Sequence, residues 1–449
     1  MSAVPLASGL DGPAEAELRE LDGRRIVWFR VAGGEHHGAI GSAAGATVER
    51  AIRTAQQLGV PLVGELDTSG ADVAENVAAL AAWGRCAREL VHTSGVVPTL
   101  VTVTGACLSG PALMLGVFDF VVMTRDAFAY VSGPESVAQF TGVAVTRQEL
   151  GGAEVHATRS GLAALVVDDE AAAHDAIRTL LAYVPDHHLA DPPRSIADDP
   201  RDRRCTRAAA VVPVRRTASY DVRAVVEDVL DRESFFELRP SHAANVVTGL
   251  GALDGRPIGV IANQPRTRAG TLDIDASRKA ARFVTWCDAF NVPLVTFVDT
   301  PGFEPGRDLE WRGMIRHGAQ LAHAYCAATV PRLCVVLRKA YGGAYIVMDS
   351  RGVGNDYSVA WPGAEIAVMG AEPAVRILHG RRGLSAAEEG VLVAEYEQEF
   401  LGPTRAAERG LIDVVVDPLD TRRILCDALD ALATKRESEP FRRHSNTPL

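Results

Sequence analysis

The stretch Val60-Pro61-Leu62-Val63, followed by Asp67-Thr68 and Gly70, recurs as Val292-Pro293-Leu294-Val295, followed by Asp299-Thr300 and Gly302. The two copies are 232 residues apart, and each is typical of a buried strand that ends in a turn. A repeat on this scale constrains the architecture of the whole chain, because each copy is expected to fold into the same unit.

Further matches follow in the same order on both sides of this stretch. They are Leu21-Asp22-Gly23-Arg24 with Leu253-Asp254-Gly255-Arg256, Val97-Pro98 with Val330-Pro331, and Val166-Val167-Asp168 with Val415-Val416-Asp417. Short β-branched runs alternate with amphipathic segments such as 47–58 and 272–290, which indicates βα units. The sequence therefore predicts an α/β protein of two homologous halves, with an exposed Asp- and Arg-rich linker between them.

Composition excludes several classes of protein. The chain has 449 residues, of which 47% are hydrophobic and 23% charged, as in ordinary globular domains. Its net charge of −11 repels polyphosphate, so nucleic acid is not expected as a partner. Seven scattered cysteines without metal-binding spacing predict a reduced compartment with buried thiols and no metal site.

No segment has the pattern of a secretory signal or a membrane span. The first twenty residues are acidic, and the most apolar stretch, 98–123, is interrupted by glycines, a proline and an aspartate. Such a stretch suits a buried strand, a turn, a helix and a second strand. We therefore expect a cytoplasmic protein that does not enter a membrane.

A glycine-rich turn lies at matched places in the two halves. Gly342-Gly343-Ala344 follows the apolar run 333–337, and Ser109-Gly110-Pro111 follows the run 99–103. Main-chain N–H groups at the start of a helix have no intrahelical acceptor and are able to hold an oxyanion. The alternative is that each turn only allows a helix to pack closely on its strand. Two such turns favour a reaction in which two carbonyl groups gather negative charge.

Several longer motifs carry a family resemblance. They are Asp299-Thr300-Pro301-Gly302-Phe303-Glu304-Pro305-Gly306, Ile315-Arg316-His317-Gly318-Ala319, Arg338-Lys339-Ala340-Tyr341-Gly342-Gly343-Ala344-Tyr345, Ala367-Val368-Met369-Gly370-Ala371 and Ala406-Ala407-Glu408-Arg409-Gly410. In this combination the chain resembles the carboxyltransferase (β) subunits of biotin-dependent acyl-CoA carboxylases of the propionyl-CoA and acetyl-CoA carboxylase type. The resemblance runs from about residue 22 to the C-terminus and is densest after residue 253.

The resemblance implies two tandem crotonase-like (ββα spiral) domains. It places an acyl-CoA-side domain at 1–200, a linker at 201–223 and a biotin-side domain at 224–449. It implies a homohexamer with active sites at subunit interfaces, and a partner (α) subunit that carries biotin carboxylase and biotin. The chain has no phosphate-loop motif and no Lys-Met biotin attachment motif, so both of those functions are expected on other chains.

The implied reaction moves a carboxyl group from carboxybiotin to the α-carbon of a short acyl-CoA, without a side-chain base or a metal. By position, the N–H groups of Gly343 and Ala344 face the biotin ureido oxygen, and those of Gly110 and residue 111 face the thioester oxygen. The remaining expected residues are Ser109, Ala112, Gly133, Pro134, Tyr345 and Ile346 for the substrate, and Gly342, Gly302 and Phe303 for biotin.

The first turn departs from the family pattern. Residue 111 is proline, which has no N–H, where the family usually has Ala-Gly-Gly-Ala over 108–111. One interpretation is that Pro111 has no effect on activity, because proline is favoured at the first position of a helix. The other is a missing donor. In that case Gly110 alone holds the oxyanion and activity is weakened, or the N–H of Ala112 or the hydroxyl of Ser109 compensates.

Two rival functions therefore stay open beside the main one. The chain has a shorter segment before its first Asp-Gly motif than the family usually has, which together with Pro111 favours an unusual or carrier-bound acyl substrate, or a decarboxylase. The second rival is a non-catalytic structural subunit of a carboxylase complex.

Overall fold

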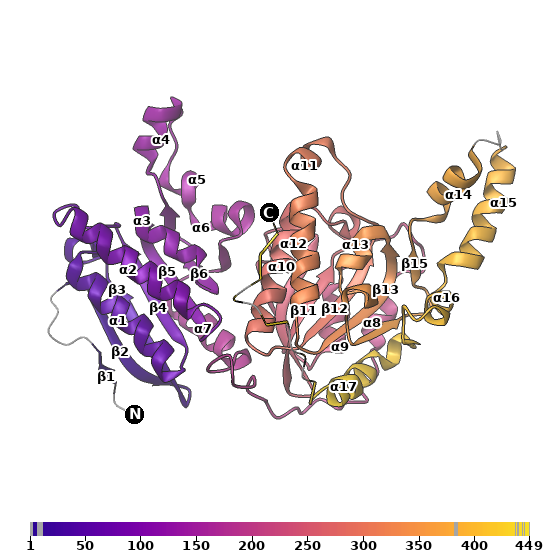
Figure 1. Cartoon of the computed structure of the whole chain (residues 1–449), viewed down its shortest axis with the longest axis horizontal. Helices are drawn as coiled ribbons and strands as arrows, with labels where there is room; N and C mark the ends of the chain where they lie inside the picture. The colour runs from indigo at the N-terminus through magenta and orange to yellow at the C-terminus, as the bar shows by residue number, and fades with distance from the viewer. Residues whose placement is uncertain are drawn as a thin grey trace. The chain divides into compact units, whose positions relative to one another are not determined.

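The computed structural model of the chain describes residues 3–6, 12–380, 385–435, 437, 440–441, 443 and 445–448. The chain divides into two compact units (Figure 1). The first comprises residues 1–193 with 239–242 and 289–291, and the second comprises 194–238, 243–288 and 292–449.

The first unit is a mixed sheet with helices packed on it. Its strands are β1 (Val4–Pro5), β2 (Ala14–Leu21), β3 (Arg24–Val31), β4 (Leu62–Thr68), β5 (Thr99–Leu108), β6 (Phe120–Thr124), β7 (Phe128–Tyr130) and β8 (Ala163–Val167). Its helices are α1 (Ser42–Leu58), α2 (Val77–Thr93), α3 (Ser109–Ala112), α4 (Pro134–Thr141), α5 (Arg147–Gly151), α6 (Ala153–Val155) and α7 (Glu170–Tyr183). The sheet order is β1-β2-β3-β4-β5-β6-β8, and β7 pairs with the far end of β5.

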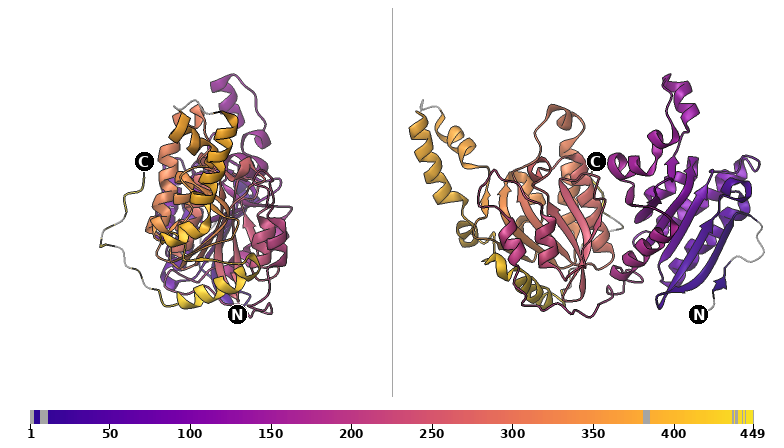
Figure 2. Two further views of the ribbon diagram at one scale, coloured as in Figure 1. Left: turned by 90° about the vertical axis from the view of Figure 1, so that its right-hand side faces the viewer. Right: turned by 180° about the vertical axis from the view of Figure 1, so that it is seen from behind.

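The second unit repeats this plan and adds helices. Its strands are β9 (Phe236–Leu238), β10 (Val246–Leu253), β11 (Arg256–Asn263), β12 (Leu294–Thr300), β13 (Arg332–Tyr341), β14 (Tyr357–Ala360), β15 (Glu365–Ala367) and β16 (Val414–Val415). Its helices are α8 (Thr206–Val211), α9 (Arg223–Val229), α10 (Ile274–Ala289), α11 (Arg307–Trp311), α12 (Met314–Ala327), α13 (Gly342–Val347), α14 (Ala371–His379), α15 (Ala386–Tyr396), α16 (Pro403–Glu408) and α17 (Thr421–Ala431). The order is β16-β14-β13-β12-β11-β10-β9, with β15 paired to β13. Figures 1 and 2 show α14 and α15 extending away from this sheet.

The predicted duplication is confirmed by strand pairing. β2 and β3 form an antiparallel pair that is followed by parallel pairing to β4, β5, β6 and β8. β10 and β11 form the same antiparallel pair, followed by parallel β12, β13, β14 and β16. The predicted segments 47–58 and 272–290 correspond to α1 and α10. α1 begins five residues earlier than predicted and ends at the same residue, and α10 is shorter by two residues at its start and one at its end.

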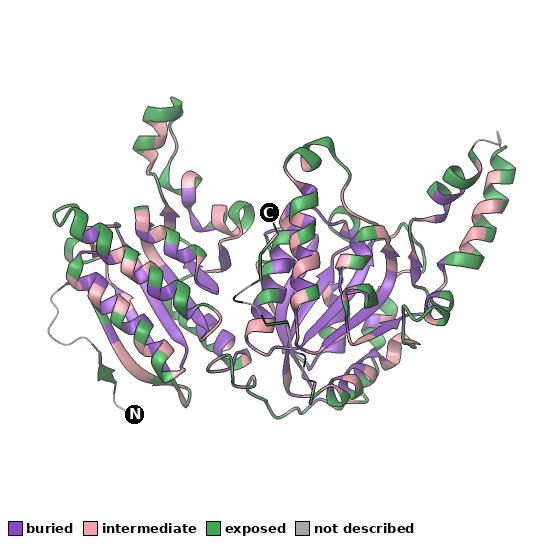
Figure 3. Ribbon diagram, in the orientation of Figure 1, coloured by how far each residue is buried: buried purple, intermediate pink, exposed green. Residues whose placement is uncertain are grey.

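Each core forms where the apolar faces of helices meet a sheet. Along α1 the buried residues recur at helical spacing, as in Val48, Ala51, Ile52 and Ala55, and they pack on the apolar strands of the first sheet. In the second unit α8, α9 and α17 bury apolar residues against β10, β11 and β13. Figure 3 shows the central strands of both sheets as buried and the outer helix faces as exposed. Central parallel strands are apolar on both faces because helices cover both sides.

Two local expectations differ from the structure. The segment 201–223 was expected to be an exposed linker, but Cys205, Ala208 and Tyr220 lie in the core of the second unit, because α8 packs on α9 there. The expectation of buried thiols is wrong for Cys326, which is exposed on α12, while the other six cysteines are buried. Within the described residues no helix is both long and apolar enough to cross a membrane.

Candidate functional site: two matched glycine elbows

The two glycine turns have the same backbone geometry, and we call them the first elbow (109–112) and the second elbow (342–345). Strand β5 ends at Leu108 and α3 begins at once, just as β13 ends at Tyr341 and α13 begins. The first residue of each elbow has a left-handed backbone, with φ of 62° at Ser109 and 59° at Gly342. The chain thus reverses sharply, and the next residues begin a helix whose first N–H groups have no intrahelical acceptor.

Side-chain contacts fix the strand end that delivers the second elbow. The hydroxyl of Tyr341 donates a hydrogen bond to the carboxylate of Glu365 on β15, and Arg216 forms an ion pair with the same carboxylate at 2.5 Å. Arg216 also pairs with Glu397. Burial, and next the bond to Glu365, raise the pKa of Tyr341, so its hydroxyl stays protonated and keeps donating.

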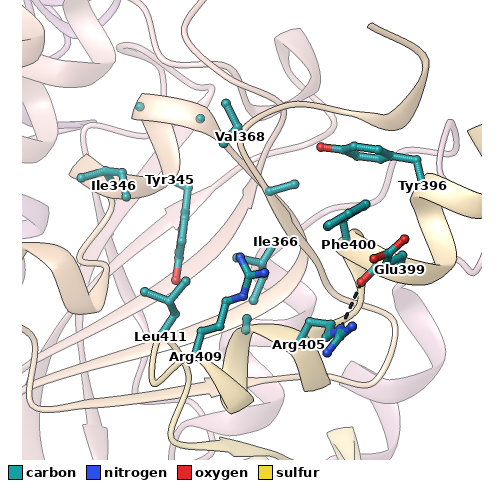
Figure 4. A pocket seen from close by; sticks show the side chains of 14 residues that line it. Tyr345, Ile346, Ile366, Val368, Tyr396, Glu399, Phe400, Arg405, Arg409 and Leu411 are labelled. Carbon is teal, nitrogen blue, oxygen red and sulfur yellow. Dashed lines mark hydrogen bonds between the residues drawn. The ribbon is translucent and has the colours of Figure 1, made fainter. Parts of the chain in front are cut away.

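A pocket of about 410 Å³ opens beside the second elbow (Figure 4). Its wall includes main chain from the elbow, β15, the segment 396–400 and α16. The lining residues are Gly342, Gly343, Tyr345, Ile346, Ile366, Ala367, Val368, Tyr396, Glu399, Phe400, Arg405, Ala406, Arg409 and Leu411. Most of these side chains are apolar, and the few polar groups include two arginines. This composition is typical of a small-molecule site.

Several residues that were predicted from the sequence lie at this pocket or at the elbow beside it. Tyr345 is buried, extends into the pocket and has a hydroxyl without a hydrogen-bond partner among the described residues. Ile346 is 44% exposed on the pocket wall, so it is not a core residue. The ring of Phe303 lies over Gly343, since a Cβ placed on that glycine would be 3.5 Å from the ring. Ala344, within the elbow, is fully buried.

A buried ion pair lies behind α13. The carboxylate of Asp349 is fully buried, accepts a bond from Arg332 Nη1 at 3.1 Å, and lies near Thr296 and Tyr325. Burial raises the pKa of Asp349 to about 7, although the charge of Arg332 lowers it. The carboxyl group of this buried pair therefore has a pKa close to neutral pH.

The first elbow has a different surrounding. Pro111 is buried, and a Cβ placed on Gly110 would lie 2.6 Å from Cε2 of the Trp83 ring on α2. The Trp83 ring thus packs directly on Gly110, and its indole N–H has no hydrogen-bond partner among the described residues. Gly70, the counterpart of Gly302, also packs on this elbow, because its Cβ would lie 2.9 Å from the carbonyl oxygen of Leu108.

Gly133 and Pro134 are connected to the first elbow through β7. Leu108 pairs with Tyr130 on that strand, and Gly133 then caps α4, with Pro134 at the first helical position. Ala112 ends α3 and is half-buried.

Sequence reasoning missed the residues on the far wall of the pocket. Arg409 and Ala406 belong to a motif that carried the family resemblance, but their place opposite Tyr345 required the tertiary fold. Trp83 was also missed, because one tryptophan on an amphipathic helix has no distinctive pattern. Within the described parts of the chain no group of three His, Cys, Asp or Glu side chains is arranged to hold a metal ion.

Comparison with known proteins agrees with this geometry. Residues 20–447 match the family described as the carboxyl transferase domain. The propionyl-CoA carboxylase carboxyltransferase subunit of Haloferax mediterranei is 43% identical over 96% of this chain and 84% of its own length. The methylmalonyl-CoA decarboxylase subunit alpha of Veillonella parvula is 38% identical over the same shares.

A solved structure extends the comparison to the fold. The transcarboxylase 12S hexamer with methylmalonyl-coenzyme A bound has a TM-score of 0.95 and 37% identity over 97% of this chain and 85% of that chain. Such a likeness at this identity confirms the predicted tandem crotonase-like fold. The chain belongs to the carboxyl transferase family and is an enzyme, a carboxyltransferase of the propionyl-CoA and methylmalonyl-CoA carboxylase type.

Proposed function

We propose that this enzyme moves a carboxyl group between carboxybiotin, carried on a partner protein, and the α-carbon of a short acyl-CoA. The observation that carries the proposal is the second elbow, which opens onto an apolar pocket and offers main-chain donors at its edge. A neutral bicyclic ring with one carbonyl oxygen fits those surroundings. When bound there, carboxybiotin would supply CO2 and, once it is released, a ureido anion basic enough to take the α-proton, so that the enolate carbon could bond to the CO2.

The protein's own contribution in this account is electrostatic. The N–H groups of Gly343 and Ala344 stabilise the charge on the ureido oxygen, and the ring of Phe303 lies over Gly343. Gly302, the residue before Phe303, is proposed to line the same biotin site. Each well-placed donor of this kind is worth about 3 kcal/mol of transition-state stabilisation. Because the pKa of Tyr345 is raised by burial, its hydroxyl is a neutral donor that helps to hold a ligand in the pocket.

The first elbow is proposed to hold the thioester oxygen. Gly110 supplies one N–H, and Pro111 supplies none. Of the two compensating groups, the Ser109 hydroxyl is exposed at the elbow and the Ala112 N–H belongs to the same short helix. Gly133 and Pro134 follow the strand beside this elbow, where they are proposed to line the acyl-CoA site.

One wall of the pocket is also proposed to contact the acyl group. Ile346 is a half-exposed apolar side chain beside the second elbow, and we assign it to the wall that contacts a short alkyl chain. In this proposal residues 1–200 form the acyl-CoA side and 224–449 the biotin side.

The proposed assembly is a homohexamer in the cytoplasm that works with a biotin carboxylase and biotin carrier subunit. It is supported by the hexameric assembly named for the transcarboxylase 12S structure. A decarboxylase is the second candidate, since the Veillonella relative is a subunit of a methylmalonyl-CoA decarboxylase.

The test is a carboxylation assay with carboxybiotin and a panel of acyl thioesters. Turnover of acetyl-CoA or propionyl-CoA supports the proposal. Turnover of carrier-bound acyl groups alone, or decarboxylation of methylmalonyl-CoA alone, supports the rival activities. Assembly with a biotin-bearing partner without turnover of any thioester would instead identify a structural subunit.

A further inference from the structure

Both elbow strands contain a break in register at the same place. Leu66 on β4 pairs with Val103, but Thr68 pairs with Cys107, so β5 has extra residues across this step. In the second unit Val298 pairs with Val336, whereas Thr300 pairs with Ala340. At such a break the regular ladder is interrupted and some N–H groups lose their usual acceptors.

At each break in register, an aspartate carboxylate accepts a main-chain hydrogen bond. Oδ1 of Asp67 accepts a hydrogen bond from the N–H of Ala106 at 2.9 Å. Oδ1 of Asp299 accepts one from the N–H of Lys339 at 3.1 Å. The two aspartates are 232 residues apart and the two donors 233, so the same bond occurs at matched positions. This bond from side chain to main chain replaces a missing ladder bond, and it is neither helix capping nor a turn bond.

The strand end that each aspartate contacts is the segment that leads directly into the elbow. Beyond the break β5 leaves β6 and pairs with β7 over Ala106–Leu108, and β13 leaves β14 and pairs with β15 over Lys339–Tyr341. Each elbow begins at the next residue. The direction of these three-residue strand ends therefore decides where the N–H groups of Gly110 and Gly343 point.

Neighbouring residues hold each of the two carboxylates in position for this contact. Asp299 is 1% exposed, and its Oδ2 accepts a bond from Arg338 Nε at 3.0 Å. Burial raises the pKa of Asp299, and the Arg338 charge and the Lys339 N–H oppose that rise. Asp67 is packed between two glycines, because a Cβ on Gly33 or Gly105 would lie within 2.0 or 2.4 Å of its carboxylate oxygens. Any larger residue at either glycine would displace the carboxylate.

We propose that Asp67 and Asp299 are positioning residues, each of which aims the main-chain donors of one elbow through the hydrogen bond that its carboxylate accepts from the main chain of the preceding strand end. The proposal rests on the proposed function of the elbows. It assigns Asp67 to the acyl thioester side and Asp299 to the biotin side. A misplacement of about 1 Å in a reacting geometry is able to cost about 100-fold in rate.

The chain offers a matched control for each carboxylate at the opposite end of the same strand. Asp119 Oδ2 accepts the N–H of Thr99 at 2.8 Å at the start of β5, and Asp356 Oδ2 accepts the N–H of Arg332 at 2.8 Å at the start of β13. These carboxylates bind the same two strands, but they do so at the starts of the strands, whereas the elbows follow the strand ends.

The experiment compares D67A, D299A, D119A and D356A in the full-length chain. Thermal unfolding is measured together with the initial rate of carboxyl transfer, with carboxybiotin and propionyl-CoA varied separately. D67A is expected to lower kcat/KM for propionyl-CoA at least tenfold and to leave KM for carboxybiotin within twofold. D299A is expected to lower kcat/KM for carboxybiotin at least tenfold and to leave KM for propionyl-CoA within twofold. D119A and D356A are expected to lower the unfolding temperature with both kinetic constants within threefold.

Asparagine variants protect the test against misfolding. The side-chain oxygen of Asn in D67N still accepts the Ala106 N–H, so D67N should recover most of the activity that D67A loses. The proposal is overturned if D67A and D299A match D119A and D356A, or if D67N is as impaired as D67A. A wild-type chain that transfers no carboxyl group would instead refute the function proposed for the elbows, and the positioning roles with it.

Discussion

The first and second elbows share a backbone but differ in what surrounds them. Both begin with a left-handed residue, and both follow a strand braced by an aspartate. The second elbow has Ala344 and a pocket beside it, while the first has Pro111 and a tryptophan ring packed on Gly110. The difference teaches that duplication preserved the strand, turn and helix of each elbow, while the third elbow residue and the side chains packed around the elbow diverged.

The largest effect is expected when the second elbow is made like the first. Ala344→Pro removes one N–H at a position where the matched first elbow already has proline, so the backbone should accept it. We expect kcat to fall about 100- to 1,000-fold, because one oxyanion donor is lost. Initial rates of propionyl-CoA carboxylation measure this. Ala344→Gly keeps the N–H and is the control, and an equal loss in both variants would contradict the role of the donor.

A steric comparison should give the next largest effect. Gly110→Ala places a methyl group 2.6 Å from the rigid Trp83 ring, whereas Gly343→Ala places it 3.5 Å from Phe303. We expect Gly110→Ala to destabilise the fold by about 1–3 kcal/mol, and Gly343→Ala to change it by less than about 1 kcal/mol. Thermal unfolding of both variants measures the two changes in stability. Equal shifts would show that the Trp83 ring does not restrict the first elbow.

The reverse exchange tests the first elbow. Pro111→Ala restores an N–H, and kcat should rise up to about tenfold if the thioester oxygen lacks a donor there. The measurement is kcat with saturating propionyl-CoA and carboxybiotin. An unchanged kcat would mean that Ser109 or Ala112 already compensates, or that proline there is only a helix-start residue.

The smallest predicted effect concerns the ion pair behind the second elbow. Asp349 has a folded pKa of about 7, raised above its unfolded value near 4. The folded state then binds more protons than the unfolded state between these values, so stability falls as the pH rises. We expect a loss of about 1 kcal/mol between pH 6 and pH 8. Unfolding curves at both pH values measure it, and Asp349→Asn should remove this slope. A wild-type slope of the opposite sign would contradict the raised pKa.

The sequence predicted the duplicated scaffold better than the surroundings of the elbows. The matched Val-Pro and Asp-Thr anchors predicted β4, β12 and the strands beside them, because a strand followed by a glycine turn leaves a local pattern. The wall of the pocket could not be predicted in this way, since Tyr396 and Arg409 come to line the same pocket as Tyr345 only through tertiary packing. The packed segment around Ala208 was missed because its charged neighbours hide a short apolar face.

The central claim is that main-chain donors at the two elbows stabilise the charge that develops during carboxyl transfer. Its most direct test is transfer of a 13C-labelled carboxyl group from methylmalonyl-CoA to biotinamide, followed by NMR for the wild type, Ala344→Pro and Pro111→Ala side by side. The account predicts transfer by the wild type, at least 100-fold slower transfer by Ala344→Pro, and transfer by Pro111→Ala that is at least as fast as wild type. Equal rates in all three proteins would contradict it.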